Sequence, residues 1–275
     1  MRDTQHTMEL IVLGSSASFP AAGDACSGYL IRHGATEILL DCGSGVLSNL
    51  LAETELSRLS AIVITHFHPD HYIDLVPMRY GLRYGTGDQM RPRLFVPPGG
   101  AAVLERIGSG LRNSPSFFSA SFEVTEYDPD HSLVIDDLTL RFQRTTHDEP
   151  AWAVAIDSAA GDAGRFVYTS DTRNCPELEA FARGAGLLLC EATYPSAAFD
   201  LPSDNHLTSG QAGELARAAG VAGLVLTHFW PSFERAQFRA GAEAVFKGPV
   251  ELAEPGLRLR IRAEMATRSD TLVVS

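Results

Sequence analysis

Short runs of apolar residues alternate with polar loops along the whole chain. Alternating or continuous apolar runs between turn residues predict strands, and apolar positions every three or four residues predict helices. The expected strands cover 8–13, 28–33, 36–40, 61–64, 94–97, two strands within 133–146, 152–156, 165–169, 186–190, 224–227 and 257–261. The expected helices cover 46–55, 73–84, 99–107, 208–219 and 234–246. Strands thus precede helices in both halves of the chain.

This order of elements predicts an α/β fold in which two sheets pack face to face with helices outside, a four-layer αββα sandwich. Length alone would allow one large domain or two small ones. Because no Pro- or Ser-rich linker divides the chain, we expect a single domain over 1–275 with a core over about 8–262. Thr208 and Gln211 are spaced as a capping box for the 208–219 helix, and Gly220 should end it.

Composition narrows the partners that the protein can have. The 22 Lys and Arg residues against 34 Asp and Glu give a net charge of −12. That balance argues against a surface that wraps long nucleic acid, because neutralising phosphates needs clustered cations. We find no apolar stretch of signal-peptide or membrane-span length, so we expect a cytoplasmic protein with no membrane partner. The cysteines lack any metal or disulfide spacing and are expected to be reduced core residues.

The segment 61–71, AIVITHFHPDH, carries the strongest chemical signal. A short buried strand leads into a polar loop that contains His66, His68, Asp70 and His71. Loops at the carboxyl ends of strands present ligand-binding groups in α/β layers. Imidazole nitrogen and carboxylate oxygen are donors that a borderline ion such as Zn²⁺ accepts. We therefore interpret this loop as the start of a metal site rather than a solvated polar turn.

The stretch THFHPDH resembles the signature of the metallo-β-lactamase superfamily. Members of that family complete two metal sites with a later His, a bridging Asp and a final His, each in a loop after a strand. Matches follow in the same order, as His147 in RTTHDEP, Asp171 in YTSDT and His228 in LTHFWP, and the resemblance runs over about 8–262. It implies two divalent ions, Zn²⁺ first and Mn²⁺ or Fe as alternatives. The implied ligands of one ion are His66, His68 and His147, those of the other are Asp70, His71 and His228, and Asp171 bridges the two.

Three further acidic or imidazole groups acquire a role through this resemblance. Asp41 is similar to the family's acidic residue that supports the metal loop, although a turn-forming Asp before Gly is the competing interpretation. Glu191 in CEATY and His206 in DNHLTSGQAG resemble a pair in the ribonuclease Z-like phosphodiesterase branch, where the His lies near the leaving oxygen and the Glu supports it. A turn carboxylate and a polar helix entry are the alternatives. In this branch a metal pair lowers the pKa of a bridging water toward about 7, Asp70 orients the hydroxide as base, and His206 acts as general acid.

The spacing of the later motifs narrows the substrate. Transfer RNA 3′-end nucleases of this branch carry a long arm between the third His and the bridging Asp, but only 24 positions (171 − 147) separate them here. HLTSGQAG and LTHFWP are most similar to small phosphodiesterases, including bacterial cyclic-nucleotide phosphodiesterases. We therefore expect a phosphodiesterase for a small diester or nucleotide. The alternatives are a thiolester or lactone hydrolase on the same metals, a tRNA 3′-processing endonuclease, and a metal-binding sensor module without turnover.

A basic and aromatic patch follows the metal loop. Its members are Arg79, Tyr80, Arg83, Tyr84, Arg91 and Arg93. Such a patch can hold a phosphate and stack a base, or it can form a solvated face or a subunit contact. By analogy with the family, we expect a homodimer with the 73–84 helix as its contact.

Overall fold

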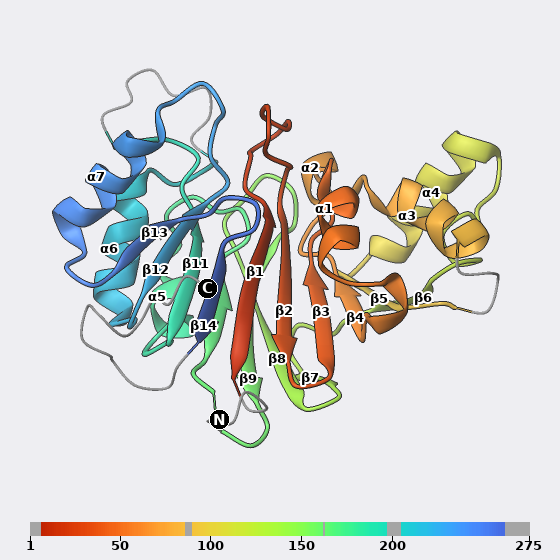
Figure 1. Ribbon diagram of the computed structural model, residues 1–275, viewed down its shortest axis with the longest axis horizontal. Coiled ribbons are helices and arrows are strands. Elements are labelled where there is room, and N and C mark those ends of the chain that lie inside the picture. Colours follow the sequence, from red (N-terminus) through yellow and green to blue (C-terminus); the bar gives the residue numbers. More distant parts are fainter. Residues whose placement is uncertain (1–6, 86–89, 162, 197–204, 262–275) are drawn as a thin grey trace.

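Two seven-stranded mixed sheets pack against each other, and helices cover their outer faces (Figure 1). This computed structural model describes residues 7–85, 90–161, 163–196 and 205–261. The four-layer αββα arrangement predicted from the sequence is confirmed. The boundaries 1–275 for one domain and 8–262 for its core stay predictions, since 1–6 and 262–275 lie outside the described residues.

The first sheet has the strand order β14-β1-β2-β3-β4-β5-β6. Its strands are β1 (Met8–Gly14), β2 (Gly28–His33), β3 (Thr36–Leu40), β4 (Ala61–Val63), β5 (Arg93–Val96), β6 (Glu123–Glu126) and β14 (Arg258–Ile261). Pairing from β14 to β3 is antiparallel, and pairing from β3 to β6 is parallel. The last strand of the described residues therefore lies beside the first.

The second sheet has the order β13-β12-β11-β10-β9-β8-β7. Its strands are β7 (Leu133–Ile135), β8 (Leu138–Arg144), β9 (Trp152–Ser158), β10 (Phe166–Tyr168), β11 (Leu187–Glu191), β12 (Leu224–Thr227) and β13 (Val250–Leu252). It too has an antiparallel half, β7 to β10, and a parallel half, β10 to β13. The halves of the chain thus form similar sheets.

The helices divide between the two sheets. They are α1 (Val46–Glu53), α2 (Pro69–Tyr72), α3 (Leu75–Tyr80), α4 (Gly100–Arg112), α5 (Glu177–Phe181), α6 (Ser209–Ala219) and α7 (Arg235–Val245), with a 3₁₀ turn at Leu56–Arg58 and a π-helical segment at Gly81–Gly85. Figure 1 shows α1 to α4 on the side of the first sheet and α5 to α7 on the side of the second. The predicted capping box of Thr208 and Gln211 is present, and Gly220 ends α6 with φ 63°.

The sequence of strand β1 is apolar at nearly every position because both faces of the strand are buried. Leu10 and Val12 point into the core between the sheets, whereas Ile11 and Leu13 pack in a second core beneath the helices. Successive side chains of a strand point to opposite faces, so a strand covered on both sides needs apolar residues on both. All four cysteines are free and buried, as expected.

Some elements differ from the sequence-based expectations. The expected helix over 73–84 is shorter, because α3 begins at Leu75 and passes into the π-helical segment after Tyr80. Strands β6 and β13 and the short helix α5 were not predicted. Both missed strands lie at sheet edges and contain glutamates, and short charged edge strands lack a clear apolar pattern. No helix in the described ranges is long and apolar enough to cross a bilayer.

Candidate metal centre

Four strands deliver polar side chains to one edge of the two packed sheets. The loop after β4 carries His66 and His68. The loops after β8, β10 and β12 carry His147, Asp171 and His228, respectively. These three strands belong to the second sheet, while β4 belongs to the first. The site therefore forms only where the two halves of the fold meet.

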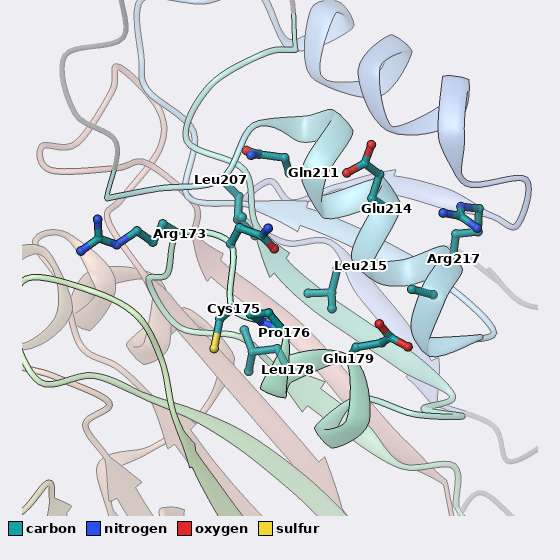
Figure 2. A pocket seen from close by; sticks show the side chains of 12 residues that line it. Arg173, Cys175, Pro176, Leu178, Glu179, Leu207, Gln211, Glu214, Leu215 and Arg217 are labelled. Atoms are coloured by element: carbon teal, nitrogen blue, oxygen red, sulfur yellow. The ribbon is translucent and has the colours of Figure 1, made fainter.

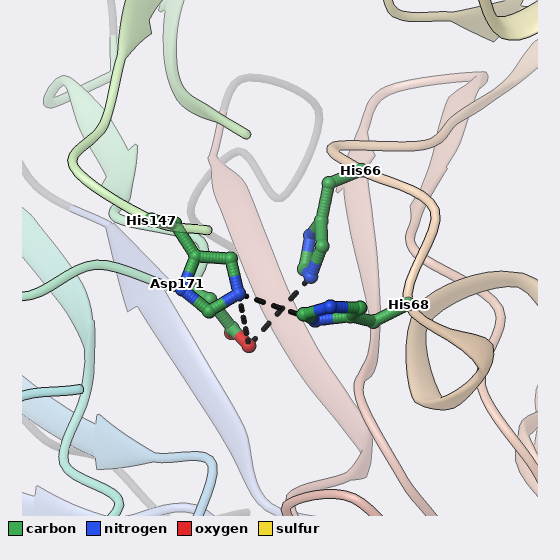
Figure 3. A group of neighbouring side chains, drawn as sticks. All are labelled: His66, His68, His147 and Asp171. Atoms are coloured by element: carbon green, nitrogen blue, oxygen red, sulfur yellow. Dashed lines mark hydrogen bonds and ion pairs between the residues drawn. The ribbon is translucent and has the colours of Figure 1, made fainter. Parts of the chain in front are cut away.

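The first of two groups of donors contains His66, His68, His147 and Asp171, whose ligand atoms all lie within 4.8 Å of one another. His147 Nε2 lies 3.1 Å from His68 Nδ1 and 3.9 Å from Asp171 Oδ2. His66 Nε2 lies 3.7 Å from the same carboxylate oxygen. Figure 3 shows the three rings and the carboxylate converging on one point.

The second group contains Asp70, His71 and His228. His228 Nε2 is 3.3 Å from Asp70 Oδ2 and 3.4 Å from His71 Nε2. Asp171 lies between the two groups, since its carboxylate oxygens are 3.3 Å from both His71 Nε2 and His228 Nε2. The structure thus brings together all seven residues named from the sequence, with Asp171 in the central position. We call these seven residues the donor cluster.

The hydrogen bonds of the histidine Nδ1 atoms show which ring nitrogen can bind a metal. His71 Nδ1 lies 2.8 Å from Asp41 Oδ2 and His147 Nδ1 3.2 Å from the carbonyl of Asn205, so both Nδ1 atoms must be donors. His228 Nδ1 lies 2.9 Å from the hydroxyl of Thr193, which itself donates to Glu191 and therefore accepts from the ring. In the neutral imidazole, a protonated Nδ1 leaves a lone pair on Nε2. Those lone pairs face the interior of the cluster.

A divalent ion fits these residues. The Nε2 atoms of His71 and His228 lie 3.4 Å apart, and two lone pairs at this distance repel each other unless a proton or a cation lies between them. Among the described residues, buried His66 Nε2 and Asp171 Oδ1 have no hydrogen-bond partner. Buried polar atoms without partners are costly, and metal coordination would satisfy both. Imidazole and carboxylate donors suit Zn²⁺ and neighbouring ions, but the donor set does not select one of them.

Asp41 holds the metal loop from behind. Its carboxylate accepts hydrogen bonds from the Thr65 amide and hydroxyl, at 2.8 and 2.9 Å, and from the Tyr168 hydroxyl at 3.1 Å. The same carboxylate orients His71, the supporting contact that the resemblance implied. The groups around Asp41 therefore fix both the start of the loop and one of its imidazoles, as outer-shell carboxylates commonly do.

One expectation about the loop is wrong. Asp70 and His71 were expected in an irregular loop, but they lie in the helical turn α2, which begins at Pro69. Proline suits the first position of a helix because its φ is already fixed there and its missing N–H is not needed. The turn presents Asp70 and His71 to the same group of donors, and the Ser18 amide donates to Asp70 Oδ2 at 2.7 Å.

Buried charges shift the pKa values within the cluster. Burial alone would raise the pKa of Asp171, but the His228 and His71 imidazoles hold it well below its ordinary value. Burial, together with neighbouring His71, lowers the pKa of His66 well below the ordinary histidine range. Asp171 is therefore ionised and His66 neutral near pH 7, which are the states in which each can bind a metal. Burial disfavours a charged His71, but Asp171 and Asp41 raise its pKa well above the ordinary value, so His71 would release a proton when a metal binds.

His206 and Glu191 form a pair beside the cluster. Buried Glu191 accepts from His206 Nδ1 at 3.0 Å and from the amides of Thr172 and Leu207 at 2.7 and 3.2 Å. Burial disfavours a charged imidazole, but Glu191 and then Asp171 outweigh it and raise the pKa of His206 to about 9. His206 also belongs to a third potential donor group with Asp171 and His228, which the sequence did not indicate. His206 is therefore protonated near neutral pH, as a general acid must be.

Several backbone positions around the site are strained. Only six non-glycine residues in the described ranges have positive φ, and four of them, Ser18, Asp41, Ser170 and His228, lie in the loops that form or support the cluster. Such conformations each cost on the order of 1–3 kcal/mol and persist where surrounding contacts impose them. The sequence reasoning missed Ser170 and Thr193 as supporting residues. Their only signal was a small polar residue next to a predicted strand end.

Aromatic side chains border the cluster at the loop after β1 and the loop after β12. Phe19 follows the Ser18 amide that binds Asp70, and its ring lies 6.0 Å from that of Trp230 in an edge-on arrangement. Phe19 is 49% exposed, which leaves one side of its ring open. Tyr194 lies 6.2 Å from Trp230 and 6.3 Å from the ring of His206. These rings form an aromatic rim next to the donors.

A partly open hollow of about 170 Å³ adjoins the site, and no member of the donor cluster lines it (Figure 2). It lies between the segment after Asp171 and helices α5 and α6, and Arg173, Cys175, Leu207 and Leu215 are among its lining residues. Since Leu207 directly follows His206, the hollow lies behind the general-acid candidate. Neither the donor cluster nor His206 or Glu191 lines this hollow.

The comparisons with known proteins agree with the geometry. A family model described as a beta-lactamase superfamily domain matches residues 36–229. The chain is 31% identical over 249 residues to the probable metallo-hydrolase YhfI of Bacillus subtilis, which covers 90% of this chain and 98% of that protein. It is 30% identical over 276 residues to a ribonuclease Z of Mycobacterium sp. strain KMS, covering 92% and 96% of the two chains.

Solved structures show the same fold. The crystal structure of the metallo-beta-lactamase fold protein YhfI from B. subtilis matches with a TM-score of 0.83 at 28% identity, over 92% of this chain and 99% of that one. The short form of human tRNase Z matches with a TM-score of 0.70 at 22% identity, over 92% and 99%. Because the family model spans most of the chain and the relatives are matched over nearly their whole length, the chain belongs to the metallo-β-lactamase superfamily.

Proposed function

We propose that this metallo-hydrolase is a phosphodiesterase that cleaves small diesters, with cyclic nucleotides first among them. The observation that carries the proposal is the His206–Glu191 pair beside the donor cluster. Glu191 accepts a hydrogen bond from His206 Nδ1, and His206 Nε2 has no hydrogen-bond partner among the described residues. A proton held at Nε2 suits an alkoxide leaving group, which departs poorly unless it is protonated.

Each residue of the site has a separable task in this reaction. The donor cluster would hold two divalent ions, which supply Lewis-acid polarisation of the phosphoryl oxygens and an activated water. Asp70, whose pKa the His71 and His228 imidazoles lower against the effect of burial, stays ionised and accepts a proton from the attacking water. His206 donates its Nε2 proton to the leaving oxygen as the bond between phosphorus and that oxygen breaks, and it then takes up a proton from solvent, while Asp70 releases the proton that it accepted. Glu191 keeps the imidazole protonated between turnovers.

The aromatic rim supports a nucleotide substrate. Phe19 follows the Ser18 amide that donates to Asp70, its ring lies 6.0 Å from that of Trp230, and base stacking on an aromatic side chain contributes roughly 1–3 kcal/mol. A base attached to a small cyclic phosphate would reach these rings while its phosphate occupies the cluster. The sequence had suggested Tyr80 and Tyr84 for this contact, but the loops that flank the donors contain Phe19 and Trp230 instead.

The segment between His147 and Asp171 supports a small substrate. Strands β9 and β10 account for ten of its residues, and short connections make up the rest of its described residues. This interval is too short to form a protruding arm that would bind a folded RNA. Long polyanions also meet net repulsion from a chain of charge −12 unless a cationic track offsets it. Ribonuclease Z is nevertheless among the relatives, so precursor tRNA is the substrate to be tested against.

The test is a comparison of kcat/KM under one metal and salt condition for cyclic AMP, bis-nitrophenyl phosphate, a thiolester and precursor tRNA. We expect hydrolysis of the two diesters and far slower cleavage of tRNA. Efficient, site-specific tRNA cleavage would overturn the size argument. Thiolester turnover without diesterase activity would favour the alternative hydrolase, and absence of turnover with both metal sites filled would indicate a sensor module.

Location, metal identity and assembly are further parts of the proposal. We propose a cytoplasmic enzyme that uses Zn²⁺, with no membrane partner and no long nucleic acid as ligand. A homodimer through the face that contains α3 remains a prediction from family analogy. Equilibrium sedimentation and elemental analysis of the purified protein test the assembly and the metal separately.

A further inference from the structure

Asp148 directly follows His147 and turns its carboxylate toward the first group of metal donors. Its Oδ1 lies 3.1 Å from His147 Nε2 and 3.8 Å from His68 Nε2. Figure 3 shows these two imidazoles converging with His66 and Asp171. Asp148 is outside the donor cluster, and no spacing in the sequence singles it out, because it is the immediate neighbour of an expected ligand. Its position beside the site therefore needs an explanation of its own.

Hydrogen bonds orient both sides of this contact. The amide of Glu149 donates to Asp148 Oδ1 at 3.0 Å, which anchors the oxygen that faces the imidazoles. His147 Nδ1 donates to the carbonyl of Asn205 at 3.2 Å. A neutral ring that donates through Nδ1 carries a lone pair on Nε2. The carboxylate oxygen and this lone pair thus face each other.

A cation between them accounts for the contact. A carboxylate oxygen and a nitrogen lone pair 3.1 Å apart repel each other unless a proton or a cation lies between them. His147 Nε2 also lies 3.1 Å from His68 Nδ1, so a single proton on Nε2 would serve only one of its two neighbours. A cation that all three residues coordinate would serve both.

The separation of the two atoms is that of ligands on one ion. Metal–ligand distances of about 2.1 Å, with angles of about 90° to 109° between ligands, place neighbouring ligand atoms roughly 3.0–3.4 Å apart. The distance of 3.1 Å between Asp148 Oδ1 and His147 Nε2 falls in this range. A carboxylate oxygen is also a donor that zinc and its neighbours accept together with imidazole.

Exposure distinguishes Asp148 from the buried donors of this group. Its side chain is 55% exposed, whereas those of His147 and Asp171 are 1% exposed. The carboxylate therefore lies on the solvent side of the imidazole, where an anion from solution would approach an ion in the site. A ligand that is open to solvent can leave and return without unfolding its surroundings, which a buried donor cannot do.

We propose that Asp148 is a further ligand of the ion held by His66, His68 and His147, and that anions from solution displace it. A carboxylate and a phosphate oxygen are both anionic oxygen donors, so they compete for the same position on the ion. Asp148 thus strengthens metal binding and weakens the binding of phosphate. Neither effect depends on which ester the enzyme cleaves, so both can be tested without turnover.

The first test is metal affinity, measured on the full-length protein by competition with a chelator. Asp148→Asn keeps the size of the side chain and removes its charge, and the exposed position should let the variant fold. Carboxylates that only support a ligand change metal affinity about 10–100-fold, so we expect the Kd of one of the two ions to rise at least about tenfold.

Glu149→Gln is the matched control. Glu149 is exposed and adjacent, and its substitution changes the net charge by the same amount while leaving the amide that donates to Asp148. Its metal affinity should equal that of wild type. The visible spectrum of bound Co²⁺, which depends on ligand type and geometry, should shift in Asp148→Asn and stay unchanged in the control.

The second test is calorimetric titration of the metal-loaded proteins with inorganic phosphate at constant ionic strength. The Kd of phosphate should fall in Asp148→Asn, because the anion no longer has to displace the carboxylate. It should stay at the wild-type value in Glu149→Gln. The metal content of each sample is measured before the titration, so that weaker metal binding is not mistaken for weaker phosphate binding.

Three results would overturn the proposal. Equal metal affinity and equal Co²⁺ spectra in Asp148→Asn and wild type would show that Asp148 does not bind the ion. Equal effects in Asp148→Asn and Glu149→Gln would assign the change to net charge and not to coordination. Phosphate binding that is no tighter in Asp148→Asn than in the control would contradict displacement by anions.

Discussion

Replacing His206 with alanine tests the proposed general acid directly. The imidazole donates to Glu191 through Nδ1 and leaves Nε2 for the leaving oxygen. Removing a positioned acid costs roughly 10²–10⁴ in rate, or about 3–5 kcal/mol at 1.36 kcal/mol per factor of ten. We therefore expect kcat to fall at least about a hundredfold for a substrate with an alkoxide leaving group.

The variant should still fold. Glu191 loses one hydrogen bond but keeps those from the Thr172 and Leu207 amides and from the Thr193 hydroxyl. Loss of a hydrogen bond to a charged group costs about 1.5–3 kcal/mol, which is small beside a typical stability of about 5–15 kcal/mol. Thermal unfolding should therefore remain cooperative, with a lowered midpoint.

The assay compares two leaving groups. Cyclic AMP releases an alkoxide and needs the acid, whereas bis-nitrophenyl phosphate releases nitrophenolate, which departs without protonation. The loss of kcat should be large for the first substrate and less than about tenfold for the second. His131→Ala is the matched control, because His131 is exposed and pairs only with Asp128 in the described structure. It should leave both rates unchanged.

Two outcomes would refute this reasoning. Equal losses for both substrates would remove His206 from the general-acid role. A loss of bound metal in His206→Ala would instead identify His206 as a ligand, consistent with its place in a group with Asp171 and His228. Metal content must therefore be measured on the same samples.

Other changes have equally direct expectations. Asp171→Ala should lower the metal content from about two ions per chain and abolish hydrolysis, because Asp171 lies between the two groups of metal donors. Elemental analysis that still finds two ions per chain would refute this prediction. Asp41→Asn removes the carboxylate that orients His71 and should weaken metal affinity about 10–100-fold in chelator competition, with an unchanged affinity counting against the supporting role. Burial raises the pKa of the Cys26 thiol to about 12, so the native protein should react slowly with a thiol reagent. Only unfolding should make all four buried thiols reactive, and a rapid reaction of the native protein would contradict their burial.

The sequence predicted the central elements well because their signals are local. The strand over 61–63 is apolar throughout, and four donors follow it at once. The later donors were found by resemblance, since nothing in local periodicity links His147 to His228. Their convergence depends on strands that are distant in the chain and become neighbours only in the sheets.

Other features could not be read from the chain because they depend on tertiary contacts. The helical turn that carries Asp70 is too short to show periodicity. Arg91 and Arg93 were grouped with the basic patch, yet Arg91 donates to the backbone of Ser119 and Phe122, and Arg93 pairs with Asp136. An arginine that binds its own chain and one that remains available to a ligand look alike in sequence. The partners, which are backbone carbonyls for Arg91 and the Asp136 carboxylate for Arg93, are brought into place only by folding.

The pairing of β14 with β1 has a consequence for how the chain is made. Strand β1 has β2 on one side from early in synthesis, but its other edge stays open until residues 258–261 have left the ribosome. An open edge strand can recruit strands from other nascent chains. Contacts between such distant segments also slow folding, because loop closure precedes any gain from the contact. Ribosome-bound chains that end before residue 258 should therefore depend more on chaperones than the released protein does.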